Sequence, residues 1–262
     1  MDNTSSVDKG EVTLRAIYII GGIAAMIAVI LFRRYLGVEL VQFRGFGIIP
    51  DIPLEYPSSA VDWFNLFQNN RIIGLSLFAL VDLINYALVG LIFLALFGAL
   101  VEVNRSAMVV ATSFALIGVA VYFASNQAFA MLSLNDQYMA ATSEEQRAML
   151  LAAGEALLAI HNPGGIYQGT GMYVSLFLVL LAGLIVSIVM LQGDRLGKIT
   201  ATLGILANGI GLVYFIVLVF WPEILWLPPT LSAPFRMIWY ILIAVKLFKL
   251  SRGEKWTGNE TG

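Results

Sequence analysis

Six long apolar stretches, each bounded by charged or helix-breaking residues, constrain this 262-residue chain more than any other feature. A helix needs about 20 mostly apolar residues to cross the hydrocarbon core of a bilayer, which is about 30 Å thick. Most of the stretches reach that length, so the sequence predicts an all-α membrane protein, a bundle of six transmembrane helices. The stretches cover residues 14–32, 72–101, 107–132, 171–191, 199–220 and 235–250.

The composition supports this interpretation and excludes several kinds of site. Charged residues make up 12% of the chain, against about 25% in a soluble domain. The net charge of −2 gives no basic field for a nucleic acid. The chain has no cysteine and one histidine, whereas a zinc site needs three or four protein ligands. We therefore predict no metal, no cofactor and no nucleic-acid partner.

The stretches define a single integral membrane domain over residues 1–262. Polar tails are expected at 1–13 and 251–262, and long connections at 37–71 and 135–170. The first stretch is too long for the apolar part of a signal peptide, about 7–15 residues. It ends in Arg33-Arg34 rather than at a small-residue cleavage site, so we interpret it as an uncleaved first span.

The first connection contains a short helix, predicted at about 58–68. Ser59 is placed to cap its N-terminus, with Asp62 three residues later. Trp63, Phe64 and Phe67 share one side, which favours an interfacial helix anchored in the headgroup layer by its aromatic rings. The alternative is a ridge that binds a partner.

The second connection contains an amphipathic loop helix, predicted at about 143–161. Ser143 is the expected N-cap, with Gln146 at the third helical position, and Asn-Pro-Gly-Gly at 162–165 ends the helix. Its apolar part is about 20 Å long, too short to cross a bilayer. We expect it to lie on the bundle or to re-enter it. A seventh crossing is the alternative, and it would place the termini on opposite sides.

Six spans place both termini on one side of the membrane. Nine of the fifteen Lys and Arg residues fall on that side, which favours cytoplasmic termini in the cell membrane and outward-facing long connections. The pair Arg33-Arg34 falls on the other side and opposes this orientation. The nine are Lys9, Arg15, Arg105, Arg195, Lys198, Lys246, Lys249, Arg252 and Lys255.

Ionisable groups at membrane depth are candidate functional residues. Asp82 falls near the middle of the second stretch, and Asn85 and Tyr86 follow on the same helical face. In the alternative interpretation Asp82 is protonated or hydrogen-bonded, and these polar groups only join helices. The residues that complete a predicted ligand or ion pocket on other spans are Asn126, Gln127 and Asn208.

Three further polar residues are expected near the outer side: Glu155, His161 and Arg236. Arg236 opens the last stretch, where the helix dipole disfavours a cation, so it needs an acidic partner or must extend to the headgroups. His161 has the position of a residue at a helix end, and acid–base chemistry is its alternative role. A catalytic role would require all three side chains to converge.

Several segments carry a family resemblance. They are Val-Asn-Arg-Ser at 103–106, Gln-Tyr-Met-Ala-Ala-Thr at 137–142, the run 146–153, the run 197–208 and Trp239-Tyr240. Over about residues 72–250 the chain resembles a widespread prokaryotic family of multi-spanning membrane proteins classified only as a domain of unknown function. The resemblance implies a prokaryotic cell-membrane location, and it supplies no catalytic residues.

Three functions remain open. We expect a non-catalytic membrane protein with an accessory, structural or sensing role. The first alternative is a small transporter or carrier of a lipophilic ligand that uses a polar pocket around Asp82. The second is an intramembrane enzyme acting on lipids. The lipid bilayer is the expected partner in each case, with a second copy of the chain or another membrane protein as a further possibility.

Overall fold

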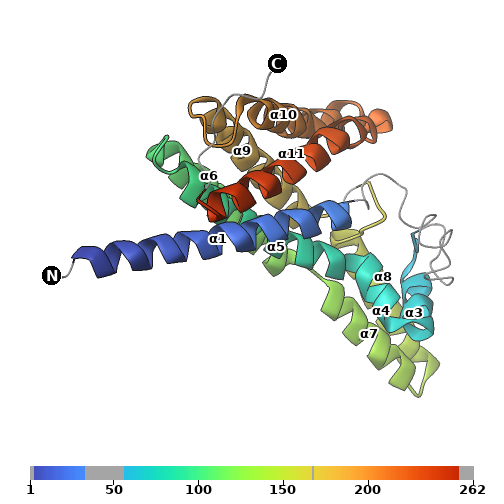
Figure 1. The fold of residues 1–262 in the computed structure, drawn as a ribbon. Coiled ribbons are helices and arrows are strands. Elements are labelled where there is room, and N and C mark those ends of the chain that lie inside the picture. The colour runs from blue at the N-terminus through green and yellow to red at the C-terminus, as the bar shows by residue number, and fades with distance from the viewer. Residues whose placement is uncertain (1–2, 33–55, 167, 254–262) are drawn as a thin grey trace. The chain divides into compact units, whose positions relative to one another are not determined.

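The computed structural model describes residues 3–32, 56–166 and 168–253, with side chains from Leu14 onward in the first segment (Figure 1). Most of the predicted first connection, 37–55, and the end of the C-terminal tail, 254–262, lie outside the described residues. The described residues form helices and no strand. Six helical segments are long and apolar enough to cross a membrane. The all-α class and the six candidate spans are thereby confirmed.

Where a single bundle was expected, the chain forms two compact units. Unit 1 contains the described residues of 1–36, 86–119 and 176–262, and unit 2 contains those of 37–85 and 120–175. Three long helices continue from one unit into the other along the sequence: α5 (Val81–Leu100), α6 (Arg105–Ser125) and α9 (Thr170–Leu191). At these three places the boundary between the units falls within a helix.

In unit 1, helix α11 (Leu227–Ser251) packs along both α1 (Asn3–Phe32) and α10 (Lys198–Phe220) (Figure 1). Small residues allow these close contacts, as is usual between helices in lipid. A Cβ added at Gly21 would overlap the Ala95 side chain, and one added at Gly204 would lie 2.5 Å from the Trp239 indole nitrogen. Glycine at these positions sets how near the helix axes lie.

Two short turns of unit 1 are hydrogen-bonded to one another. Arg195 pairs with the Glu102 carboxylate and donates to the Ala99 carbonyl at 3.1 Å. The Asn104 carboxamide donates to that of Gln192 at 3.1 Å. The turn after α5 and the turn after α9 therefore lie together at one end of unit 1.

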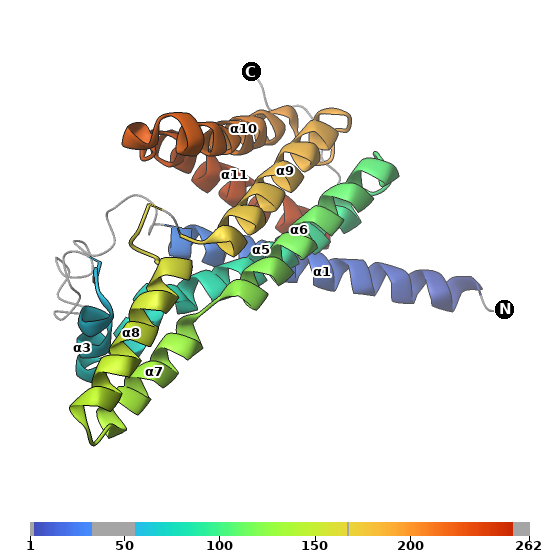
Figure 2. The same ribbon diagram turned by 180° about the vertical axis from the view of Figure 1, so that it is seen from behind.

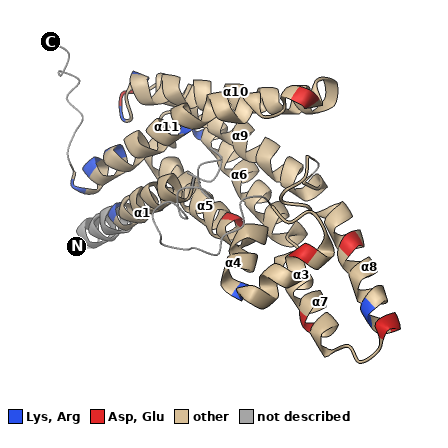
Figure 3. Ribbon diagram, turned by 90° about the vertical axis from the view of Figure 1, so that its right-hand side faces the viewer, with Lys and Arg blue, Asp and Glu red and all other residues tan. Residues whose placement is uncertain are grey.

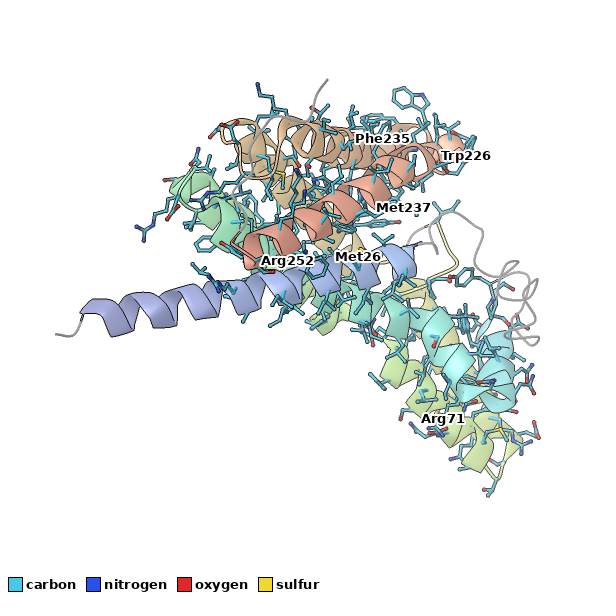
Figure 4. The ribbon with its side chains drawn as sticks, in the orientation of Figure 1. Met26, Arg71, Trp226, Phe235, Met237 and Arg252 are labelled. Carbon is cyan, nitrogen blue, oxygen red and sulfur yellow. The ribbon has the colours of Figure 1, made fainter. Side chains whose placement is uncertain are left out.

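Unit 2 is built around a pair of antiparallel helices, α7 (Ala128–Ala140) and α8 (Glu144–Ile160), which are joined by a short turn (Figure 2). Helix α3 (Ala60–Asn69) packs on both. It is followed by α4 (Arg71–Leu75) and by η2 (Ser76–Leu80), a π-helical turn that leads into α5. Arg71 of α4, labelled in Figure 4, pairs with Asp136 of α7 at 2.5 Å.

The predicted short helix at about 58–68 exists as α3, but its aromatic side is not an interfacial anchor. Trp63, Phe64 and Phe67 are at most 2% exposed, and the Trp63 ring lies edge-on to Phe78, with centroids 4.8 Å apart. These rings form the hydrophobic core of unit 2 together with side chains from η2, α7 and α8. The expectation of a headgroup-facing aromatic side is wrong because the rings find protein partners.

The N-terminus of α3 is capped as predicted. The Ser59 hydroxyl accepts the Asp62 amide at 3.2 Å, and the Asp62 carboxylate accepts the Ser59 amide at 3.2 Å. The hydrogen bond from the Ser59 hydroxyl, with smaller help from Ser58, lowers the pKa of Asp62. Glu155 of α8 adds a second cap by accepting the Ala60 amide at 2.7 Å.

Helix α8 also follows its prediction. The Ser143 hydroxyl accepts the Gln146 amide at 3.2 Å, and the helix ends at Ile160, just before the Asn-Pro-Gly-Gly segment. The Gln146 carboxamide accepts from the Thr142 amide at 3.4 Å, one residue before the N-cap. Figure 3 shows the charged residues of its first turn near the connection from α7.

Helical structure extends beyond the predicted stretches in three places. The third stretch breaks at Asn126-Gln127, and helix α7 then continues to Ala140, so the second connection does not begin at 135. Polar Asn135 is buried within α7, where its carboxamide nitrogen donates to the Asp136 carboxylate at 3.4 Å. The N-terminal helix already begins at Asn3, within the predicted tail. The last helix begins at Leu227, near the exposed Trp226 of Figure 4, because proline is compatible with a first helical turn.

Two glycines of α10 provide a matched test of the packing in unit 1. A Cβ at Gly204 would overlap the Ser187 hydroxyl, whereas a Cβ at Gly209 would meet nothing within 4 Å. We expect Gly204→Ala to lower the free energy of unfolding by about 1–3 kcal/mol through overpacking. Gly209→Ala should leave it unchanged or raise it by up to about 1 kcal/mol. Thermal midpoints in detergent measure both; equal effects would contradict the packing described.

Candidate functional site

Unit 2 contains a cavity of about 430 Å³ where helix α8 ends and helix α9 begins. The connection between these helices forms one wall, and the last residue of α6 contributes to another. Its lining residues are Ser125, Ala159, Ile160, His161, Gln168, Gly169, Thr170, Gly171, Met172 and Tyr173. The cavity therefore brings together segments of three helices that all belong to unit 2.

The described residues of the connection that borders the cavity make specific contacts. Gly169 has a φ of +99°, and a Cβ there would overlap the Ile160 carbonyl, so the position requires glycine. The Tyr173 hydroxyl donates to the Ile166 carbonyl at 2.5 Å and accepts the Gln168 amide at 3.1 Å. These contacts join the connection to the first turn of α9.

His161 occupies the C-cap position of α8, where its backbone amide donates to Leu157 at 2.9 Å. Its side chain does not cap the helix. The imidazole is 7% exposed and lies beside the Phe78 ring, with centroids 5.5 Å apart. Its Nε2 has no hydrogen-bond partner among the described residues. Burial lowers the pKa of His161, so the imidazole is neutral at pH 7.

The first turn of α9 borders the cavity. Its first helical hydrogen bond runs from the Tyr173 amide to the Gly169 carbonyl at 3.3 Å. The backbone amides of Thr170 and Gly171 therefore have no hydrogen-bond acceptor within helix α9. A side chain at Gly171 would overlap Ser125, so glycine lets the start of α9 lie against the end of α6. None of the described lining residues is Asp, Glu, Lys or Arg.

The predicted pocket around Asp82 is divided between the two units. Asp82 and Asn85 are half-buried in unit 2, and Tyr86 is buried in unit 1. Asp82 lies in the first turn of α5, directly after the π-helical turn. The Asn85 carboxamide oxygen is buried and has no hydrogen-bond partner among the residues that the structure describes.

Asn126 and Gln127 lie at the break between α6 and α7. The Asn126 carboxamide oxygen accepts the Ala128 amide at 3.0 Å, and the Gln127 carboxamide donates to the Ser125 carbonyl at 3.4 Å. Both side chains thus satisfy the backbone where the helix is interrupted. Asn208 is buried in unit 1, where its carboxamide donates to the Gly204 carbonyl at 2.7 Å.

The three outer-side candidates also have separate surroundings. Glu155 is exposed on α8 and caps α3, as described above. Arg236 is 9% exposed inside unit 1 and donates to the Ala207 carbonyl at 3.2 Å. Its guanidinium lies close to Gly211, where a Cβ would be 2.9 Å away. Of the three, His161 alone lines the cavity.

Sequence reasoning missed the other polar residues of the cavity, which include Ser125, Gln168, Thr170 and Tyr173. The sequence Gly-Thr-Gly at 169–171 stands directly before an apolar run. This pattern is typical of a helix start and could have indicated this part of the cavity. Within the described part of the chain, no group of three or more His, Asp or Glu side chains is arranged to hold a metal.

Comparison with protein-family models, curated proteins and solved structures finds no match to this chain. The resemblance noted in the sequence therefore stays a prediction.

His161 gives a direct spectroscopic test, since it is the only histidine. Burial places its folded-state pKa below the ordinary 6.5. As the pH falls below about 6.5, the unfolded chain binds the proton first, so the folded state loses stability by at most about 1.4 kcal/mol per pH unit. NMR of ¹⁵N-histidine-labelled protein without a histidine tag measures this pKa.

The variant His161→Gln should remove this part of the pH dependence. As the pH falls from 7.5 to 5.5, the thermal midpoint of the native chain should fall more than that of the variant. A histidine signal that titrates at or above 6.5 would show that the imidazole is not buried as described.

Proposed function

We propose that this chain is a multi-pass membrane protein whose unit 2 binds a small amphipathic molecule without converting it, as a sensor or a carrier. The observation that carries the proposal is the cavity beside His161. Its volume of about 430 Å³ lies within the range of small-molecule sites, about 300–1,000 Å³. Ser125, His161 and Thr170 supply polar groups, and Ile160 and Met172 supply apolar surface.

The hydrogen bonds of the site favour binding over hydrolysis. A serine nucleophile needs a base within hydrogen-bond reach, and that base needs a group that orients it. The Ser125 hydroxyl instead donates to the Tyr122 carbonyl at 3.3 Å. The His161 Nε2 has no hydrogen-bond partner in the described structure. A lipid-acting enzyme would need Glu155, His161 and Arg236 to converge. Nothing in the described structure supports that convergence.

The lengths of the helices support a location for unit 2 at the membrane surface. The apolar helical segments 71–100 and 105–140 extend up to about 45 Å and 54 Å at 1.5 Å per residue. A hydrocarbon core of about 30 Å does not accommodate their full lengths. Residues 71–85 and 120–140 belong to unit 2, so we assign this unit to the outer surface. The charge distribution and the family resemblance favour cytoplasmic termini in a prokaryotic cell membrane.

The absence of cysteine allows this topology to be tested with single introduced thiols. Thr142 and Asp194 are both exposed, in the α7–α8 connection and in the turn after α9. In intact cells a membrane-impermeant maleimide should label Thr142→Cys, and it should label Asp194→Cys only after permeabilisation. Labelling of both variants in intact cells, or the reverse pattern, would contradict the proposed orientation.

Two alanines on one face of α8 provide a matched test of ligand binding. Ala159 lines the cavity, while Ala152 is exposed two turns earlier and does not line it. We expect Ala159→Phe to abolish binding of small amphipathic compounds, because the ring fills the cavity, and Ala152→Phe to leave binding unchanged. Ligand-induced shifts of the thermal midpoint measure this effect.

The thermal midpoints of the two unliganded variants provide the folding control. If Ala159→Phe folds normally and retains every compound that the native chain binds, the cavity is not the binding site.

A further inference from the structure

We infer that a surface of unit 1, where helix α11 ends beside α1, binds the headgroup of an anionic lipid. This surface, which we call the basic rim, consists of Arg15 on α1 and of Lys249 and Arg252 at the end of α11. Binding at the rim is separate from the ligand binding proposed for unit 2, and it shares with that proposal only the location of the chain in a membrane.

Helices α1 and α11 are antiparallel neighbours, and their contacts locate the rim. A Cβ added at Gly21 would lie 3.3 Å from the Leu247 side chain. One added at Gly253 would lie 4.0 Å from the Arg15 guanidinium. Residue numbers fall along α1 as they rise along α11, so the C-terminal end of α11 lies beside Arg15. Figure 4 labels Arg252 at this end, and Figure 3 shows Lys and Arg in blue on both helices there.

The rim presents positive charge from two helices. Arg15, Lys249 and Arg252 are all exposed, and the last two lie on one face of α11 because they are three residues apart. The segments 14–32 of α1 and 227–253 of α11 contain no Asp or Glu. A guanidinium binds a phosphate through two parallel hydrogen bonds, and an ammonium adds a point charge. A phosphate headgroup with a net negative charge is therefore the complement of the rim.

The neighbouring turns of unit 1 add to this charge. The Tyr18 hydroxyl donates to the Gly98 carbonyl at 3.1 Å, which connects α1 to the last turn of α5. On α11, the Lys246 Nζ lies 3.9 Å from the position of a Cβ at Gly197, in the turn before α10. The charged residues described in the turns after α5 and α9 comprise three basic and two acidic side chains: Arg105, Arg195, Lys198, Glu102 and Asp194.

Exposed apolar side chains follow the rim along both helices, which favours a lipid over a soluble anion. On α1 they are Ile19, Ile20 and Ile23, which are 44–48% exposed. On α11 they are Ile241 and Val245, which are 38% and 43% exposed. At 1.5 Å per residue, these positions begin about 6 Å from the rim and extend to about 12 Å. A lipid whose phosphate binds the rim can place its acyl chains along them.

Native mass spectrometry of the full chain in a neutral detergent measures the binding of single lipids. The probes are phosphatidylglycerol and phosphatidylcholine with identical acyl chains, of which only the first has a net charge. We expect the native chain to bind phosphatidylglycerol at least about tenfold more tightly, since each basic residue near an anionic headgroup contributes about fivefold. Raising the ammonium acetate concentration from about 0.1 M to about 0.5 M should reduce this preference through screening.

Two double variants remove the same charge from the same end of unit 1. Lys249→Gln with Arg252→Gln should weaken phosphatidylglycerol binding about tenfold or more and leave phosphatidylcholine binding unchanged. Arg105→Gln with Lys198→Gln, which lie outside the rim, should weaken it less than about threefold. Equal losses in the two variants would assign the preference to the general positive field of this end and overturn the rim as the site.

Two further variants separate loss of charge from loss of fold. Lys249→Arg with Arg252→Lys keeps both charges and should retain the affinity for phosphatidylglycerol. Unchanged thermal midpoints and retained phosphatidylcholine binding show that the glutamine variant is folded. If it does not fold, Arg15→Gln alone provides the test, with an expected loss of about fivefold for phosphatidylglycerol. No loss in Arg15→Gln would overturn the inference.

Competition identifies the occupant. Glycerol 3-phosphate has the phosphate without acyl chains, and hexaglutamate represents an acidic protein segment. Neither should displace phosphatidylglycerol from the native chain at equal concentration. Displacement by the first would assign the rim to a soluble anion, and displacement by the second to a protein partner; either result, or equal binding of the two lipids, would overturn the inference. The proposed function is tested independently by Ala159→Phe, because Ala159 belongs to unit 2.

Discussion

The internal pairing of backbone amides and carbonyls is the constraint on which the rest of this structure depends. Hydrocarbon offers these groups no hydrogen bonds, so a chain that crosses it must satisfy them within its own helices. Six apolar segments of this chain are helical and long enough to cross it. Once helices are obligatory, close packing decides which of them touch, and Gly21 and Gly204 allow contacts in unit 1 that any larger residue would prevent.

Unit 2 is stabilised in a different way. Its core is built from large aromatic side chains, with Trp63, Phe64 and Phe78 almost completely buried, and α3 and α8 begin at serine caps. Ion pairing and capping between elements, such as Arg71 with Asp136 and Glu155 with the Ala60 amide, add polar contacts to this core.

The sequence predicted what local rules determine. Apolar length gave the six spans, and the serine caps at Ser59 and Ser143 located α3 and α8. It did not predict that the aromatic side of α3 is buried, because an amphipathic pattern looks the same whether its apolar side meets lipid or protein. His161 was selected for its chemistry, but the rest of the cavity depends on how α6, α8 and α9 meet, which residue spacing within one helix does not reveal.

The π-helical turn at Ser76–Leu80 has a consequence for the directions of the side chains on either side of it. A π-turn accommodates one residue more than the α-helical turn it replaces, so it amounts to a single-residue insertion absorbed without ending the helix. Each residue of an α-helix advances the side-chain direction by about 100°. An added residue therefore rotates the side chains that precede it about the helix axis, relative to the side chains that follow it. The side chains before the turn, in α4, and those after it, in α5, can therefore face different neighbours within one continuous helical run.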